Sequence, residues 1–176
     1  MRNQINNVPS LRFKDFSGEW KYKKLGDYIS ERNDFSTEDL PLYSLTIAEG
    51  IVPKSERYER EFLVNDVSEA YKVMYLNDFA YNPMNLRFGA LARHKGNIKV
   101  AVSKYYNIFY CNEDANSIFM EYYLTSNKLI QYYDKMSTGS LIEKKRVHYS
   151  DFVNFVRLLP SLPEQQKIAS FLTTVD

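Results

Sequence analysis

The C-terminal segment Leu159–Asp176 constrains the fold more than any other part of the sequence, because it contains the start of a helix. Pro163 suits the first helical turn, where its missing N–H would have no partner, and Glu164 complements the positive end of the helix dipole. Apolar residues then recur at helical spacing: Ile168, Phe171, Leu172 and Val175. An isolated helix shorter than about 12–15 residues is marginal in water. We therefore expect this apolar face to pack against the domain's own core or against a partner.

Composition predicts a single globular domain. A chain of 176 residues is long enough to bury one core, and its 44% hydrophobic and 26% charged residues are typical of a folded protein. No apolar run approaches the roughly 18–20 residues of a membrane span, and the N-terminus lacks the apolar core of a signal peptide. We therefore expect a cytoplasmic protein without membrane contact. The only cysteine, Cys111, excludes an internal disulfide and is expected to be a small core residue in a buried strand.

The order of the predicted elements indicates an α+β domain with a mixed or antiparallel sheet and flanking helices. Apolar and alternating runs predict strands at residues 42–47, 51–52, 86–93, 98–103, 105–111 and 155–159. Helical spacing predicts helices at 20–32, at 66–73 and from Asp114 onward. We expect the turn 95–97 to join two strands as a pair. Residues 1–160 are assigned to the domain, and residues 161–176 to the beginning of a further helix.

The sequence lacks the residue patterns of common active sites. Its six glycines are too far apart for a phosphate-binding or dinucleotide-binding loop, and no nucleophile elbow is present. His94 and His148 have no acidic or cysteine residues at the spacing of metal ligands. The segment Tyr81–Met84 is similar to the Asn-Pro-Pro-aromatic loop of amino-group DNA methyltransferases, but the second proline and the stacking aromatic are missing. We predict that this chain is not an enzyme and holds no metal or cofactor.

Three segments, in the expected order, resemble the specificity subunits of type I restriction–modification systems. Residues 160–172 are similar to the start of the family's conserved long helix, residues 8–27 to its lead-in, and Asp78–Ala90 to its central strand–loop–strand. The resemblance implies one target recognition domain, followed by the beginning of a coiled-coil spacer helix. It also implies that the domain recognises one half of a bipartite sequence in double-stranded DNA.

The resemblance implies partners as well. A methyltransferase subunit would supply S-adenosylmethionine and flip the target adenine, and a restriction subunit would supply the ATP-driven, Mg-dependent cleavage. A second target recognition domain, or a second copy of this chain, would pair through Ile168, Phe171, Leu172 and Val175. The family normally has two domains and two long helices, whereas this chain has one domain and one helix start. An alternative is a protein-interaction module that binds the methyltransferase subunit without recognising DNA, which the net charge of only +1 favours.

Polar and basic residues in two regions are the candidates for DNA contact. Arg and Lys bind guanine and Asn binds adenine in the major groove, whereas hydroxyl groups and backbone N–H groups suit phosphates. The first set is Asn82, Asn85, Arg87, Arg93, His94, Lys95 and Asn97. The second set is Ser137, Thr138, Gly139, Ser140, Lys144, Lys145 and Arg146. Asn82 and Asn85 also fit turn hydrogen bonds at an Asn-Pro corner. A third charged run, at residues 54–61, fits either a phosphate contact or a self-neutralised surface.

Overall fold

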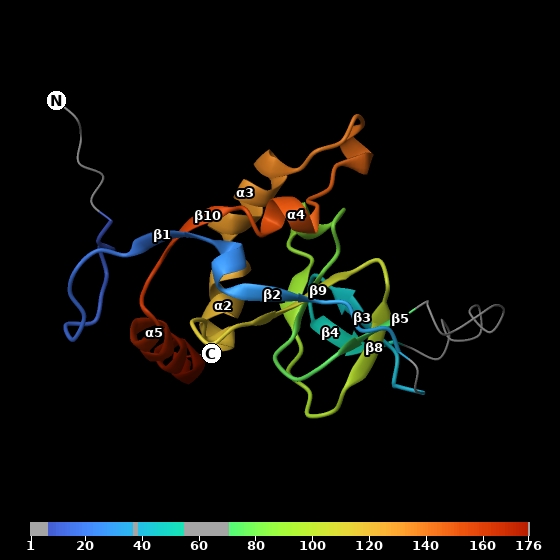
Figure 1. The fold of residues 1–176 in the computed structure, drawn as a ribbon, viewed down its shortest axis with the longest axis horizontal. Helices are drawn as coiled ribbons and strands as arrows, with labels where there is room; N and C mark the ends of the chain where they lie inside the picture. The colour runs from blue at the N-terminus through green and yellow to red at the C-terminus, as the bar shows by residue number, and fades with distance from the viewer. Residues whose placement is uncertain (1–6, 37–38, 55–70, 176) are drawn as a thin grey trace.

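Short antiparallel strand pairs form the centre of the molecule, and helices pack beside them (Figure 1). The structure, a computed structural model, describes residues 7–36, 39–54 and 71–175. The described strands are β1 (Lys21–Lys24), β2 (Ile29–Arg32), β3 (Tyr43–Thr46), β4 (Gly50–Pro53), β5 (Tyr71–Met74), β6 (Phe79–Tyr81), β7 (Leu91–Arg93), β8 (Val100–Ser103), β9 (Asn107–Cys111) and β10 (Val156–Leu159). The described helices are α2 (Ser117–Leu124), α3 (Asn127–Met136), α4 (Tyr149–Phe152) and α5 (Leu162–Val175), with 3-10 turns η1 (Leu25–Asp27), η4 (Leu86–Phe88) and η5 (Ile142–Lys144).

A four-stranded sheet in the order β2-β9-β6-β7 separates two hydrophobic clusters. Successive side chains of a strand point to opposite faces. Phe79 and Phe109 stack in the larger cluster, with ring centroids 5.0 Å apart, and the helices cover this face. Ala80 and Ile108, their neighbours in sequence, belong to the smaller cluster, which β5 and β8 cover. The alternation of side chains along β6 and β9 therefore places one hydrophobic cluster on each face of the sheet.

The N-terminal and C-terminal parts of the described chain meet where β1 pairs with β10 (Figure 1). Glu164, on the first turn of α5, is only 1% exposed and accepts hydrogen bonds from Arg12 at 2.7 Å and Trp20 at 3.2 Å. The adjacent Gln165 is fully buried; it accepts from the backbone N–H of Asn116 at 3.0 Å and donates to the carbonyl of Pro160 at 3.1 Å. One helical turn therefore holds both the lead-in and the start of α2.

The α+β prediction is confirmed, and strands lie within the predicted segments 42–47, 98–103, 105–111 and 155–159. The helix predicted at 20–32 is wrong: this segment forms β1, η1 and β2. Tyr22, part of the helical spacing, is exposed in the structure. A strand forms here because β10, from a distant part of the chain, pairs with the backbone of β1. The predicted helix start at Asp114 lies instead at Asn116, whose side chain accepts from the N–H of Phe119 at 2.9 Å.

Two further predictions of local structure are wrong. The segment 86–93 is not one strand, because Gly89, with φ of 94°, ends η4 before β7 begins. The turn 95–97 does not join a strand pair, because β7 pairs with β6 while β8 pairs with β5. Residues 71–73 of the helix predicted at 66–73 form a strand, and 66–70 lie outside the described residues. Residues 55–61 of the charged run also lie outside them. Across the described part of the chain, no helix has the length and hydropathy needed to cross a membrane.

Replacing Gln165 with alanine is expected to destabilise the fold. The variant leaves the partly buried N–H of Asn116 and the buried carbonyl of Pro160 without their partner, and a buried unsatisfied group costs about 1–3 kcal/mol. We expect urea denaturation to show a loss of about 2–4 kcal/mol in the free energy of unfolding. The matched control is Gln166→Ala, next to it on the exposed face of α5, which should change stability by less than about 0.5 kcal/mol. Equal losses in both variants would contradict this assignment.

Candidate nucleic-acid interface

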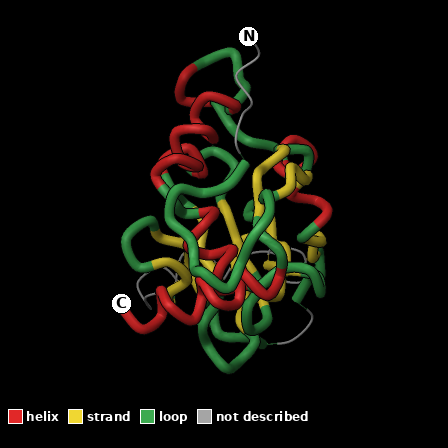
Figure 2. Tube along the Cα trace, turned by 90° about the vertical axis from the view of Figure 1, so that its left-hand side faces the viewer, coloured by secondary structure: helices red, strands yellow, loops and turns green. Residues whose placement is uncertain are grey.

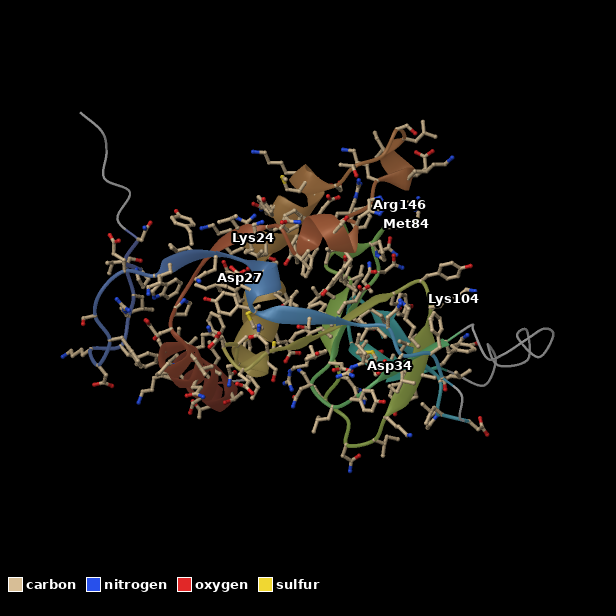
Figure 3. All side chains as sticks on the ribbon, in the orientation of Figure 1. Lys24, Asp27, Asp34, Met84, Lys104 and Arg146 are labelled. Carbon is tan, nitrogen blue, oxygen red and sulfur yellow. The ribbon has the colours of Figure 1, made fainter. Side chains whose placement is uncertain are left out.

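Two loops that are distant in sequence lie side by side. The first runs from Asn82 to Ala90 between β6 and β7, and the second from Ser137 to His148 between α3 and α4. The N–H of Val147 donates to the carbonyl of Pro83 at 3.0 Å, and the hydroxyl of buried Tyr81 donates to the carbonyl of Val147 at 3.3 Å. Figure 3 shows Met84 and Arg146 close together at this junction. We call these segments the paired loops.

The asparagines of the first loop have different environments. The side-chain oxygen of Asn82 accepts from the N–H of Met84 at 3.0 Å, so it forms the turn at the Asn-Pro corner. Asn85 is exposed, and its backbone carbonyl accepts from Phe88 and Ala90. Asn82 therefore shapes the loop, while the carboxamide of Asn85 faces solvent and is available to a ligand.

The second loop is closed by its own backbone. Thr138 and Arg146 exchange two backbone hydrogen bonds, both of 2.9 Å. A Cβ on Gly139 would lie 2.8 Å from the carbonyl oxygen of Lys144, which is closer than real Cβ atoms come to such an atom. The buried Ser137 donates its hydroxyl to the carbonyl of Asp134 at 2.7 Å, at the end of α3. Ser137 and Gly139 therefore hold the loop in shape.

The outer part of the second loop carries the exposed polar groups. Thr138, Ser140 and Lys144 are exposed, and Lys145 and Arg146 are half-buried. The guanidinium of Arg146 donates to the carbonyl of Lys144 at 3.3 Å. Hydroxyl groups and cations therefore share one short, backbone-closed loop, an arrangement that suits phosphate oxygens.

Arg87 links the two loops. Its guanidinium donates to the carbonyl of Ile142 at 3.4 Å, lies 3.4 Å from the carboxylate of Asp134 and lies over the ring of Phe88 at 4.5 Å. The side chain is only 13% exposed. Arg87 thus links the second loop to the first, and its guanidinium is paired with the carboxylate of Asp134.

The rest of the first predicted set lies at the opposite end of the β6–β7 pair, where Phe79 is opposite Arg93. Arg93 and Lys95 both bind Glu121, at 3.0 and 2.9 Å. His94 is 2% exposed and its Nε2 lies 2.8 Å from the carbonyl oxygen of Ile98, so its ring does not face solvent. Asn97 is exposed. Arg93, His94 and Lys95 line a cleft of about 390 Å³ beside β3 and β4. The structure therefore divides the first set between two places.

The apolar stripe of α5 is divided as well. Ile168 and Leu172 are half-buried, and Ile168 packs against the larger cluster. Phe171 contacts Phe13 edge to face at 5.8 Å but remains 52% exposed, and Val175 is 63% exposed. Part of the stripe thus packs on the domain, while Phe171 and Val175 remain accessible.

The described residues offer little for covalent or metal chemistry. Among them, no three His, Cys, Asp or Glu side chains gather where they could hold a metal ion. Burial raises the pKa of the Cys111 thiol to about 12, so it is protonated at neutral pH and a poor nucleophile. This agrees with the core role expected for Cys111, which packs partly buried against the larger cluster.

Sequence reasoning missed two features of this region. One is the pair Leu141 and Ile142, exposed apolar residues in an otherwise polar loop; two consecutive apolar residues between Ser140 and Glu143 were a visible signal. The other is the linking role of Arg87, for which the sequence carries no signal because Asp134 and Ile142 are brought near only by the fold.

The fold is similar to solved chains of type I restriction–modification systems. A chain from a study of complex assembly and conformational transition of the type I R-M system matches 92% of this chain with a TM-score of 0.62 and 17% identity. The HsdS subunit of Thermoanaerobacter tengcongensis matches 96% with a TM-score of 0.58 and 16% identity. The S subunit of M. genitalium matches 89% with a TM-score of 0.56 and 10% identity.

At these identities the likeness establishes a shared fold. The present chain spans 39% of the length of the first two solved chains and 38% of the third. No protein-family model and no curated protein matches the sequence.

Replacing Gly139 with alanine is expected to open the second loop locally. The new methyl group would collide with the backbone of Lys144 and Lys145, at a cost of the order of 1–3 kcal/mol. Hydrogen exchange at the amides of Thr138 and Arg146 should therefore become roughly 5- to 150-fold faster. The control is Ser140→Ala, an exposed position in the same loop. Unchanged exchange in Gly139→Ala would show that the loop tolerates the methyl group.

Proposed function

We propose that this chain is a target recognition domain of a type I restriction–modification specificity subunit, and that it recognises one half of a bipartite double-stranded DNA sequence. The observation that carries the proposal is the meeting of the paired loops. Segments selected from the sequence as DNA candidates, about fifty positions apart, lie together in a fold similar to that of solved specificity subunits. Loops on a rigid scaffold are a common place for recognition.

In this proposal the exposed groups of the paired loops contact DNA. Asn85 is suited to a base edge, because an Asn carboxamide can bind adenine through two hydrogen bonds. Thr138, Ser140, Lys144, Lys145 and Arg146 are suited to phosphates. Asn82, Arg87, Ser137 and Gly139 position the loops. Lys95 and Asn97, exposed at the other end of the sheet, would form a second and separate contact, to which Arg93 and His94 contribute by shaping the backbone.

The chemistry would belong to partner subunits. We propose that a methyltransferase subunit brings S-adenosylmethionine, that a restriction subunit brings ATP and Mg-dependent cleavage, and that this chain is non-catalytic. A second target recognition domain, or a second copy of the chain, would pair along α5. Phe171 and Val175 are the more exposed residues of the stripe and are available for that contact, since Ile168 packs on the domain and Leu172 is half-buried.

A second candidate is a protein-interaction module that binds the methyltransferase subunit without recognising DNA. The net charge of +1 and the ion pairs of Arg87, Arg93 and Lys95 with carboxylates favour it. The two candidates differ in whether binding selects a base sequence.

Selection of bound duplexes from a randomised DNA pool distinguishes them. The chain would be used with and without a methyltransferase subunit of a type I system. We expect enrichment of one short half-site, because base contacts discriminate by about 1–3 kcal/mol each. Binding of the methyltransferase subunit without any enriched sequence would overturn the DNA proposal in favour of the interaction module.

Lys144→Ala is expected to weaken binding to all duplexes alike and to lower the slope of log affinity against log salt by about 1. The reason is that a phosphate contact releases one counterion, whatever the base sequence. Lys23→Ala, an exposed lysine on β1 away from the paired loops, is the matched control and should leave the slope unchanged. Equal slopes for wild type and Lys144→Ala would remove Lys144 from the interface.

A further inference from the structure

Large apolar side chains are exposed on the paired loops. Ile142 is 73% exposed and Leu141 48%, at the outer turn of the second loop; Phe88 is 55% exposed and Met84 41%, on the first loop. Exposed single apolar residues are common, but a group on two adjoining loops is a feature of binding surfaces. The phosphate and base contacts proposed above do not use these side chains.

The turn that carries Leu141 and Ile142 is held from several sides. The N–H of Lys144 donates to the carbonyl of Leu141 at 3.0 Å, and the N–H of Lys145 donates to the carbonyl of Ile142 at 3.3 Å. Arg87 also donates to that Ile142 carbonyl. Below the turn, the two bonds between Thr138 and Arg146 close the loop. Two apolar side chains are therefore presented to solvent on a backbone that is already ordered, so little conformational entropy is lost when they insert into a partner.

The charge around this turn favours a polyanionic partner. Three cationic residues, Lys144, Lys145 and Arg146, directly follow it. Of the nearby carboxylates, Asp134 is paired with Arg87, which leaves Glu143 as the exposed acidic residue within the turn itself. An apolar projection with a cationic flank matches the way in which proteins insert wedges between DNA base steps and hold the adjacent phosphates.

We propose that Leu141 and Ile142 form a wedge that enters a groove of DNA and partly unstacks one base step, while Lys144, Lys145 and Arg146 hold the neighbouring phosphates. The inference rests on the proposed function and adds a second mode of recognition to it. Unstacking is easiest at pyrimidine–purine steps, so the wedge would select for such a step without any hydrogen bond to its bases. The half-site is then expected to contain a TA or CA/TG step where the wedge enters.

The test measures DNA bending by the full chain. The probe is a 40-base-pair duplex that carries the half-site enriched from the randomised pool, with a fluorescence donor and acceptor at its ends. We expect wild-type protein to raise the energy transfer, because wedges kink the duplex by 20–90°. Leu141→Ser combined with Ile142→Ser should lose most of this rise and keep the wild-type salt slope, since the phosphate contacts remain.

Matched variants separate insertion from a change in folding. Ile142→Leu keeps the apolar volume and should retain the bend. Ile98→Ser removes a comparably exposed apolar residue, 49% exposed, at the opposite end of the β6–β7 pair and should also retain it. Circular dichroism of the double variant checks that it folds, and Ile142→Ser alone serves as the milder change if it does not.

The outcomes are distinct. Failure to enrich any duplex would overturn the proposed function, and the wedge with it. Enrichment followed by binding without bending would overturn the wedge alone. A double variant that bends DNA like wild type would also overturn the wedge. If that variant lost binding of the methyltransferase subunit, Leu141 and Ile142 would form a protein contact instead.

Discussion

The arrangement of the whole molecule depends on two consecutive buried polar side chains, Glu164 and Gln165. Buried polar groups are costly unless they are hydrogen-bonded, so each dictates what lies beside it. Glu164 requires the cations and donors of the lead-in, Arg12 and Trp20, and Gln165 requires the start of α2 and the end of β10. A hydrophobic contact would tolerate sliding, whereas these bonds specify one register of α5 on the domain. The ion pair with Arg12 therefore contributes geometry more surely than net stability.

The register of α5 is linked to the position of the paired loops through a series of contacts. The end of β10 is fixed by Gln165, and α4, just before β10, packs Phe152 into the larger cluster between Tyr81 and Phe109, with ring centroids 5.0 and 5.5 Å away. Tyr81 then binds the carbonyl of Val147 at the base of the second loop. The contacts of Tyr81 with Phe152 and with Val147 are buried and join parts of the chain that are distant in sequence. Loops of all kinds make up much of the trace in Figure 2. The paired loops are held by buried contacts at their bases and carry exposed residues at their outer turns.

The sequence predicts those elements that depend on interactions between neighbouring residues, and it does not predict those that depend on distant parts of the chain. The helix from Leu162 was predictable because caps and apolar spacing are local signals, and so were strands such as β8 and β9. The segment 20–32 was not, since the pairing of β1 with β10 supplies a non-local partner that overrides its helical spacing. Asn85 and Lys144, predicted from the sequence as DNA contacts, are exposed in the structure. The sequence carries no signal that they lie on adjoining loops or that His94 is buried. Both depend on which strands pair.

The small net charge becomes consistent with a DNA-binding surface once the partners of the arginines are known. Arg12, Arg32, Arg87 and Arg93 each bind a carboxylate, from Glu164, Asp78, Asp134 and Glu121 respectively, and the four arginine side chains are 12–24% exposed. Within each pair the positive and the negative charge offset each other, and the planar guanidinium is well suited to bidentate bonds with a carboxylate. The charge that remains at the surface is then set by lysines such as Lys144, which are strongly hydrated and act at phosphates as point charges. These four pairs add nothing to the net charge, so the remaining side chains still carry a net charge of +1. That value is a sum over the whole molecule, and a local cationic loop can exist within it.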